Sequence, residues 1–246
     1  MSVYTHQLSA VHDRGFISLP TSNHDFQRLR CGSRGWEGLR VAWTFLMTQA
    51  GPPTIFMGDE IGMRFVPDTP PKEGSTLVGI TAPNGDSVNG ERSGTRTPMQ
   101  WDASPNNGFS EAPEDQLYLP MDPDPDRPTV AAQEIDPNSL LHFVRNLIQL
   151  RNKYPALGAK ASYECLNDAQ SAYPLIIRRS TPDQSCLILL NPSGRQISYP
   201  FDSALTIQSI LLNEGTSVRQ DDPVPAQILF DPFACAMLEV RAPGPT

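Results

Sequence analysis

The sequence lacks the long apolar run that a membrane-spanning helix requires, and it has no excess of basic residues. No apolar stretch approaches the roughly 20 residues that cross a bilayer. Lys and Arg together number 19 against 27 Asp and Glu, which gives a formal net charge of -8. Nucleic-acid affinity comes largely from neutralised phosphates, so this acidic balance argues against a nucleic-acid-binding protein. We expect neither a membrane nor a nucleic acid as partner.

Cysteine is also scarce. The 246 residues include four cysteines, spaced too widely for a disulfide-stapled mini-protein: Cys31, Cys165, Cys186 and Cys235. We therefore expect reduced thiols. The N-terminus shows no basic start followed by an apolar stretch, so no signal peptide is expected. Together these features favour a cytoplasmic location.

Motifs for several common chemistries are absent. The four histidines show no metal-ligand spacing, and no cysteine pair is close enough to complete a site. The glycines of "CGSRGWEG" match neither the dinucleotide fingerprint nor a P-loop, and no G-x-S-x-G elbow is present. The acidic "DPDPD" lacks the EF-hand pattern, and its prolines suit an exposed loop. The sequence predicts no metal site and no cofactor.

Proline, in contrast, is abundant, and apolar runs recur in a strand, helix, strand order. The 25 prolines concentrate between Pro52 and Pro137 and predict a long loop over 64–135. Before it, the run 16–21 precedes a helical pattern that ends at Gly51, and a second run covers 54–57. This order predicts a βαβ unit with parallel strands.

The segment after the loop changes from helical to strand-like patterning. Asp136 and Pro137 predict an N-cap and a first helical position, and Pro155 predicts the end of that helix. Short β-rich runs with turn signals between them then predict an antiparallel β-sandwich: "LIIRRS", "SCLILLN", "QISYPF", "LTIQSILLNE" and "QILFDPFACAMLEV". We expect a first domain over 1–158 and a second over 159–246.

Two polar clusters follow the predicted strands of the βαβ unit. His24-Asp25 and Asp59-Glu60 both fall at the carboxyl ends of strands, where ligand-binding loops gather. His24-Asp25 is equally consistent with a structural hydrogen-bonded pair and with a group that grips sugar hydroxyls. The segment "RTPMQWD" (96–102) is likewise open, either as a sugar contact or as an anchor of the loop through Met99 and Trp101.

In combination, these segments resemble a known family. "SNHDFQR", "PPTIFMGDEIGM", "RSGTRTPMQWDASPNNGFS" and "DPNSLLHFVRNLIQLRNKYPALG", in this order, resemble the C-terminal part of the α-amylase superfamily, glycoside hydrolase family 13. The similarity is greatest to its α-glucosidase, oligo-1,6-glucosidase and trehalose-synthase-like members. It implies an α/β plus all-β fold: about the last two strands of a (β/α)8 barrel, followed by the antiparallel domain.

The resemblance also implies roles for individual residues. Asp25 would be the acidic residue that stabilises the transition state by binding hydroxyls of the sugar, and His24 would contact the same sugar. Arg28 matches the arginine that commonly follows this motif, and Arg96 and Gln100 would lie near the acceptor side of the cleft. Asp59 and Glu60 would be structural.

Two motifs of the family have no match in this chain. Its nucleophilic Asp and its acid/base Glu follow barrel strands that are not represented here, and retaining hydrolysis needs both carboxyl groups. We therefore expect part of an enzyme acting on α-glucosides or α-glucans, inactive alone, with the N-terminal barrel portion as its missing complement. The alternative is a non-catalytic carbohydrate-binding or partner-assembled module.

Overall fold

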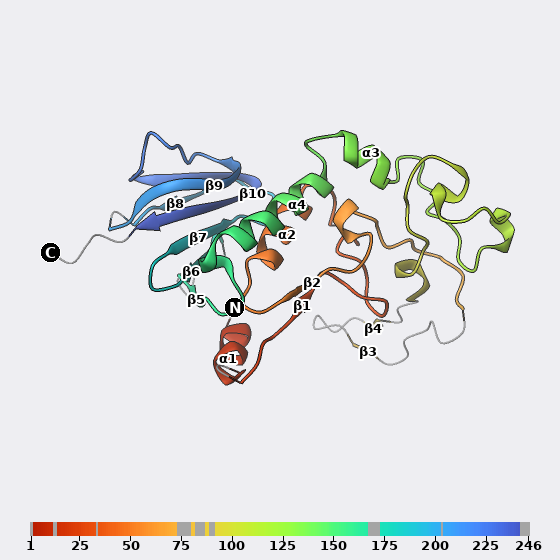
Figure 1. Ribbon diagram of the computed structural model, residues 1–246, viewed down its shortest axis with the longest axis horizontal. Coiled ribbons are helices and arrows are strands. Elements are labelled where there is room, and N and C mark those ends of the chain that lie inside the picture. Colours follow the sequence, from red (N-terminus) through yellow and green to blue (C-terminus); the bar gives the residue numbers. More distant parts are fainter. Residues whose placement is uncertain are drawn as a thin grey trace. The chain divides into compact units, whose positions relative to one another are not determined.

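A computed structural model of the chain shows two compact units (Figure 1). It describes residues 2–11, 14–32, 34–72, 80–81, 87–88, 92–166, 173–202 and 204–241. Unit 1 comprises Met1–Leu19, Arg40–Pro53 and Asn146–Thr246, and unit 2 comprises Pro20–Leu39 and Thr54–Arg145. Parts of the predicted loop 64–135 lie outside the described residues. The division into domains at 158/159 stays a prediction.

The helices and strands occur in the following order. The first half contains α1 (Ser2–Val11), β1 (Leu19–Pro20), α2 (Leu39–Met47), β2 (Pro53–Thr54), β3 (Ile80–Thr81) and β4 (Ser87–Val88). The second half contains α3 (Val130–Ile135), α4 (Leu140–Lys153), β5 (Ser162–Cys165), β6 (Leu175–Ser180), β7 (Ser185–Leu190), β8 (Ile197–Pro200), β9 (Thr206–Thr216) and β10 (Gln227–Arg241). The 3-10 turns are η1 (Asp59–Ile61), η2 (Arg92–Thr95), η3 (Pro105–Gly108), η4 (Glu114–Gln116) and η5 (Pro155–Leu157).

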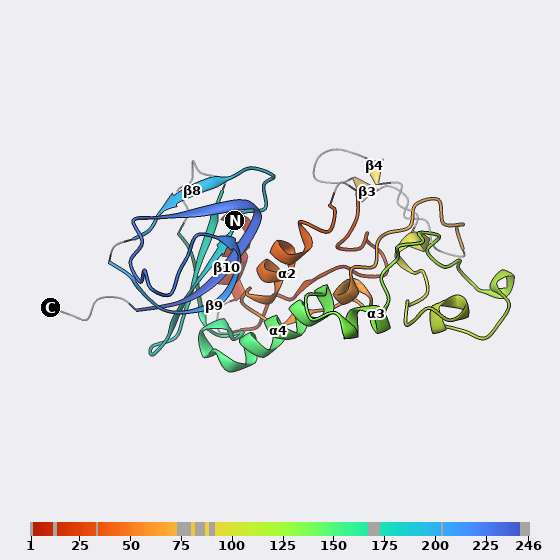
Figure 2. The same cartoon turned by 90° about the horizontal axis from the view of Figure 1, so that it is seen from above.

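Unit 1 is built on one curled antiparallel sheet (Figure 2). Its order is β5-β6-β7-β10-β8, and β9 also pairs with β10. The long strand β10 pairs with β7 through 235–240 and with β8 through 227–230. Its register with β9 shifts three times, and such irregularities bend a strand. The predicted antiparallel domain is therefore a single continuous sheet whose curvature encloses its own core.

Buried apolar side chains form the core of this sheet. Five of the six residues of β7, all but Ser185, are buried, and a run apolar on both faces suits an interior strand. The core cluster is formed by buried side chains of several strands, including Ile176, Leu189, Ile207, Phe230 and Leu238. The predicted β-rich runs thus coincide with β6 to β10.

The end of α2 is held by groups from elsewhere in unit 1. The helix ends at Met47, four residues before the predicted stop at Gly51, which adopts a left-handed φ of 94°. The guanidinium of Arg151 on α4 donates to three carbonyl oxygens there, those of Met47 (2.7 Å), Gln49 (3.0 Å) and Gly51 (2.5 Å). A helix end leaves carbonyls unpaired, and this arginine satisfies them.

Several elements differ from the sequence expectation. Helix α4 begins at Leu140, not at Pro137, and the Ser139 hydroxyl accepts from the His142 backbone N–H at 3.3 Å. The Asp136 carboxylate accepts instead from the Asn138 backbone N–H, so the N-cap prediction is wrong. The hydrophobic pattern did not reveal α1, α3 or β5. Strands β1 and β2 are two residues each, much shorter than the apolar runs that contain them.

A cluster of buried side chains lies in unit 2. It consists of Ile61, Met63, Met99 and Leu141, with Val130 packed against it. No helix among the described residues is long and apolar enough to span a bilayer.

Candidate functional site

The polar loop after β1 turns through a local hydrogen-bonded motif. The Asn23 side-chain oxygen accepts from the backbone N–H of Asp25 (2.7 Å) and of Phe26 (3.1 Å). Asparagine side chains commonly close such turns by mimicking a backbone carbonyl. The turn presents His24 and Asp25 toward solvent, with side chains 66% and 34% exposed. These two residues are therefore accessible to a ligand.

Two arginines from η2 and the residue after it hold the Asp25 carboxylate. The Arg92 guanidinium donates to Oδ1 at 2.5 Å, and Arg96 donates to the same oxygen at 3.2 Å. The other oxygen, Oδ2, lies 3.5 Å from Nε2 of His24. Arg96 also donates to the His24 backbone carbonyl at 2.8 Å. The predicted residues His24, Asp25 and Arg96 thus meet in one cluster.

This arrangement keeps Asp25 ionised. The Arg92 hydrogen bond is the largest cause and lowers the pKa of Asp25 below its usual range. Desolvation opposes it, and the charges of His24, Arg92 and Arg96 each add a smaller lowering effect. Both arginines donate hydrogen bonds to Oδ1 of Asp25. The other oxygen, Oδ2, lies near Nε2 of His24. An ionised carboxylate held in one orientation is a strong acceptor for hydroxyl groups.

Arg28 lies elsewhere. Its side chain is fully buried, and its guanidinium donates to the Met57 carbonyl (2.8 Å) and to Asp59 Oδ1 (3.3 Å). Asp59 also accepts from the hydroxyls of Thr21 (2.7 Å) and Ser22 (2.5 Å), which follow β1. This buried network ties the loop after β1 to η1. The structure therefore gives Asp59 a position suited to a structural role, and it places Arg28 beside Asp59 and apart from the Asp25 carboxylate.

Glu60 is half-buried beside this network. Its carboxylate accepts from the Gly58 backbone N–H at 2.7 Å, and burial raises the pKa of Glu60. Gly58 has a φ of 90°, so a residue without a side chain suits this turn. The side chain of Glu60 thus braces its own turn.

Gln100 is not brought to the Asp25 cluster. Its side chain is fully buried, and its amide nitrogen donates to the Pro128 carbonyl at 2.5 Å. Within the same segment, Met99 is buried in the core of unit 2, whereas Trp101 is 48% exposed. Met99 therefore anchors the segment 96–102, as one of the two alternatives predicts, but Trp101 does not, and the sugar contact stays a prediction.

Arg92 is the residue that sequence reasoning missed. It makes the shorter of the two arginine hydrogen bonds to Asp25 and is mostly buried. The only signal in the sequence is a second arginine four residues before Arg96. In the described part of the chain, no group of three or more His, Cys, Asp or Glu side chains is arranged to hold a metal ion.

Comparison with known proteins identifies the family. The family described as "Alpha amylase, catalytic domain" matches residues 2–160, well over half of the chain. The chain belongs to the α-amylase family. The resemblance predicted from the sequence motifs is thus confirmed.

Curated α-amylase family proteins are similar over parts of their length. Trehalose synthase/amylase TreS of Mycobacterium tuberculosis is 30% identical over 154 residues, which cover 61% of this chain and 22% of TreS. Oligo-1,6-glucosidase of Parageobacillus thermoglucosidasius is 34% identical over 160 residues, covering 57% of this chain and 28% of that enzyme. The chain therefore spans well under two thirds of either relative.

Solved structures confirm the fold class. Trehalulose synthase MutB from Pseudomonas mesoacidophila MX-45 superimposes with a TM-score of 0.77 at 23% identity, over 95% of this chain and 44% of MutB. The chain has the fold of the C-terminal part of an α-amylase family (β/α)8 barrel with its antiparallel β domain.

Proposed function

We propose that this chain is part of a retaining α-glycoside hydrolase or transglycosylase that acts on α-glucosides or α-glucans. Asp25 binds hydroxyls of the sugar and stabilises the oxocarbenium-like transition state. His24 contacts the same sugar, and Arg96 orients Asp25 from the acceptor side. The observation that carries the proposal is the ionised, partly exposed Asp25 carboxylate between Arg92, Arg96 and His24.

The chemistry of the cluster agrees with this role. Positive charge develops on the sugar ring in the transition state, and hydrogen bonds to the 2-hydroxyl that strengthen there supply several kcal/mol. The low pKa of Asp25 keeps its carboxylate charged at neutral pH. The arginines fix the carboxylate in advance, so little reorganisation is needed when the charge develops.

The same chemistry limits what this chain does alone. A retaining mechanism needs a nucleophile and an acid/base in addition to Asp25. None of the sequence motifs here matches the family regions that hold those two groups. We propose that the chain by itself does not turn over 4-nitrophenyl α-glucoside, and that the preceding barrel portion supplies both groups.

A chimera tests the role of Asp25. Residues 2–160 of this chain replace the corresponding region of the Parageobacillus thermoglucosidasius oligo-1,6-glucosidase, and hydrolysis of 4-nitrophenyl α-glucoside is measured. We expect turnover by the chimera and none by the isolated chain. Asp25→Asn in the chimera should lower kcat/KM by at least about a hundredfold, because several kcal/mol of transition-state stabilisation correspond to such factors.

The exposed Asp115 offers the matched control, since Asp115→Asn makes the same chemical change far along the loop. A thermal unfolding curve for each chimera establishes that it is folded. Turnover by the isolated chain would contradict the proposed dependence on a preceding portion. A folded, active chimera that tolerates Asp25→Asn as well as Asp115→Asn would overturn the role of Asp25.

A further inference from the structure

A pocket of about 750 Å³ lies within unit 2, at the loops that follow η1 and surround η3. Its size falls in the range of small-molecule binding sites. It is formed by three stretches of chain, 66–70, 103–107 and 120–127, with Glu114 at one side. None of the residues of the Asp25 cluster lines it. Unlike the loop after β1, this pocket has no role in the proposed reaction.

Asn107 is a buried polar side chain of the pocket with one unsatisfied group. It is 97% buried, since its exposed fraction is 3%. Its side-chain oxygen accepts from the Arg127 guanidinium at 2.9 Å, and its amide nitrogen has no hydrogen-bond partner in the described part of the chain. A buried donor left without an acceptor costs free energy. A ligand oxygen that accepts from this amide would remove that cost.

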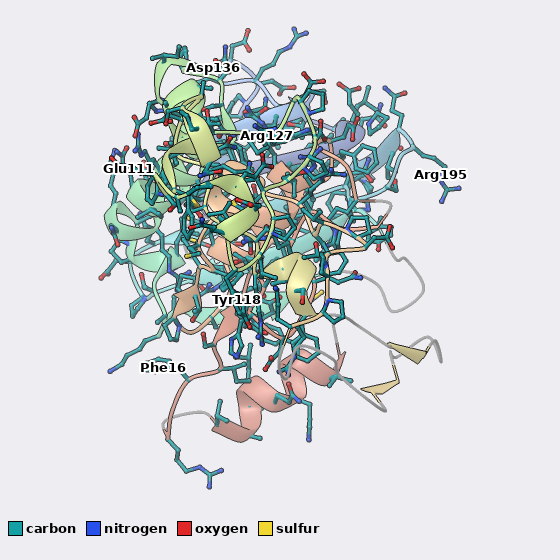
Figure 3. All side chains as sticks on the ribbon, turned by 90° about the vertical axis from the view of Figure 1, so that its right-hand side faces the viewer. Phe16, Glu111, Tyr118, Arg127, Asp136 and Arg195 are labelled. Carbon is teal, nitrogen blue, oxygen red and sulfur yellow. The ribbon has the colours of Figure 1, made fainter. Side chains whose placement is uncertain are left out.

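Arg127 supplies a second set of donors. Its guanidinium is held by Asn107 and by the Asp124 backbone carbonyl at 3.1 Å, and it lies on the segment that follows η4, where Figure 3 labels it. Neither of these contacts uses a carboxylate. An arginine has five N–H groups, so donors remain beyond these two contacts.

Acidic groups complete the lining. Asp68 and Glu114 line the pocket and can accept hydrogen bonds. Asp122 also lines it, but its carboxylate already accepts from the Arg64 guanidinium at 2.7 Å. Since Arg64 compensates Asp122, Asp68 and Glu114 remain as two carboxylates against the single Arg127 of the lining. This balance disfavours an anionic ligand, whereas a mixture of donors and acceptors suits hydroxyl groups, which do both.

Unusual backbone conformations and prolines shape the walls of the pocket. Three of its residues, Asp68, Asn106 and Asn107, hold left-handed φ values of 59°, 51° and 52°, a conformation that costs free energy for residues other than glycine. Proline fixes φ and narrows backbone motion, and the pocket is lined by five of them: Pro67, Pro70, Pro105, Pro120 and Pro123. Their rings add apolar surface of the kind that covers a sugar face.

We infer that this pocket binds an uncharged glycosyl unit, with Asn107 and Arg127 as donors and Asp68 and Glu114 as acceptors. The choice of an α-glucoside as the sugar rests on the proposed function. The inference of a polyhydroxyl ligand rests on the pocket itself. A site of this kind would hold a glucan chain without the missing barrel portion.

Calorimetric titration of the 246-residue chain with maltotriose tests the inference. We expect saturable binding that Asn107→Asp and Arg127→Gln each weaken about five- to tenfold, the usual effect of losing one or two hydrogen bonds. Asn107→Asp keeps the left-handed backbone and the contact with Arg127, because aspartate tolerates this conformation, but it removes the free amide donor. Because Asn107→Asp and Arg127→Gln are both measured, the inference can still be tested if one of the two variants misfolds.

Controls separate this pocket from the Asp25 cluster. Arg145→Gln, which alters an exposed arginine paired with Glu134, should leave maltotriose binding unchanged. Binding that is lost with Asp25→Asn but retained with Asn107→Asp and Arg127→Gln would assign the sugar to the Asp25 loop and overturn the inference. Absence of saturable binding, or tighter binding of glucose 6-phosphate than of maltotriose, would also overturn it. Neither result depends on turnover by the chimera.

Discussion

Asp25 and Asp59 are aspartates that follow two neighbouring apolar runs, yet they differ in almost every physical respect. Asp59 is fully buried and accepts hydrogen bonds from Thr21, Ser22 and Arg28. Asp25 is partly exposed and is held by arginines on one oxygen only. A carboxylate whose acceptors are all taken supports the fold, whereas one with an accessible oxygen can receive a substrate hydroxyl.

Arg92 should control the ionisation of Asp25. Arg92→Gln removes the largest cause of the lowered pKa, so the pKa of Asp25 should rise toward its usual range, as measured by carboxyl-carbon NMR during a pH titration. In the wild type, the folded pKa is lower than the unfolded one, so ionised Asp25 stabilises the fold at neutral pH, and this contribution is lost as the pH falls through the folded pKa. Arg145→Gln should leave the titration of Asp25 unchanged.

The sequence predicted the Asp25 loop but could not rank the surrounding arginines. Arg28 is three residues from Asp25 and Arg92 is sixty-seven residues away, yet Arg92 makes the contact. The Arg28 side chain is instead buried against Asp59, and no local pattern in the sequence marks Arg92 as the partner of Asp25. Gln100 shows the same limit, since residue type alone cannot distinguish a sugar contact from a loop anchor.

Breaking the buried Arg28–Asp59 pair should destabilise unit 2 strongly. Arg28→Met leaves the Asp59 charge buried without its cation, and we expect a loss of about 3–5 kcal/mol in the free energy of unfolding by urea. Adding Asp59→Asn should recover part of this loss, because no charge is then stranded. Arg145→Met, which breaks an exposed pair, should change the free energy of unfolding little. Equal losses for Arg28→Met and Arg145→Met would contradict this account.

Helices and strands marked by one strong sequence pattern were predicted well. The β-rich runs coincide with β6 to β10 because alternating or fully apolar strands have few other stable placements, and α4 ends just before Pro155 because proline cannot continue a helix. Helix α1 has no comparable signal, since its apolar residues do not form one face. The start of α4 was misplaced because Asp136 and Ser139 are both good N-cap residues, and the hydrogen bonds of Ser139 and Leu141 to Gln133 of α3 leave no pattern in the sequence.

Gly51 offers a direct test of the α2 terminus. An added Cβ would lie 2.1 Å from the Ile17 carbonyl oxygen, and the backbone φ of 94° is itself unfavourable for alanine. Gly51→Ala should therefore lower the free energy of unfolding by more than about 2 kcal/mol, measured by urea titration. Gly15→Ala is the matched control, because a Cβ there has no atom within 4 Å and should change stability little.

At the scale of the molecule, the two units interleave along the chain. Unit 1 takes three separate segments and unit 2 takes two. Sequence patterning found the change from helices to strands near residue 158, but it gives no information on which distant segments pack together. Long-range partners such as Arg151 and the α2 terminus depend on the folded arrangement and leave no local pattern.

The burial of the four thiols should be visible in one measurement on the whole chain. Cys186 and Cys235 are buried and free, and burial raises the pKa of each thiol to about 12. Cys31 and Cys165 are half-buried. With a disulfide reagent at pH 8, the native protein should react at Cys31 and Cys165 well before Cys186 and Cys235, which should react only on unfolding. Four equally fast thiols in the native state would contradict the described fold.

The place of β10 in the sheet has a consequence for biosynthesis. It follows the other five strands in the chain, yet it lies between β7 and β8 and also pairs with β9. While a ribosome is still translating residues 227–241, those three strands are already made but lack their common neighbour. At about 5–20 residues per second, β9 exposes an unpaired edge for about a second or more before β10 emerges. Until then, the backbone groups of β9 that pair with β10 have no partner from this sheet.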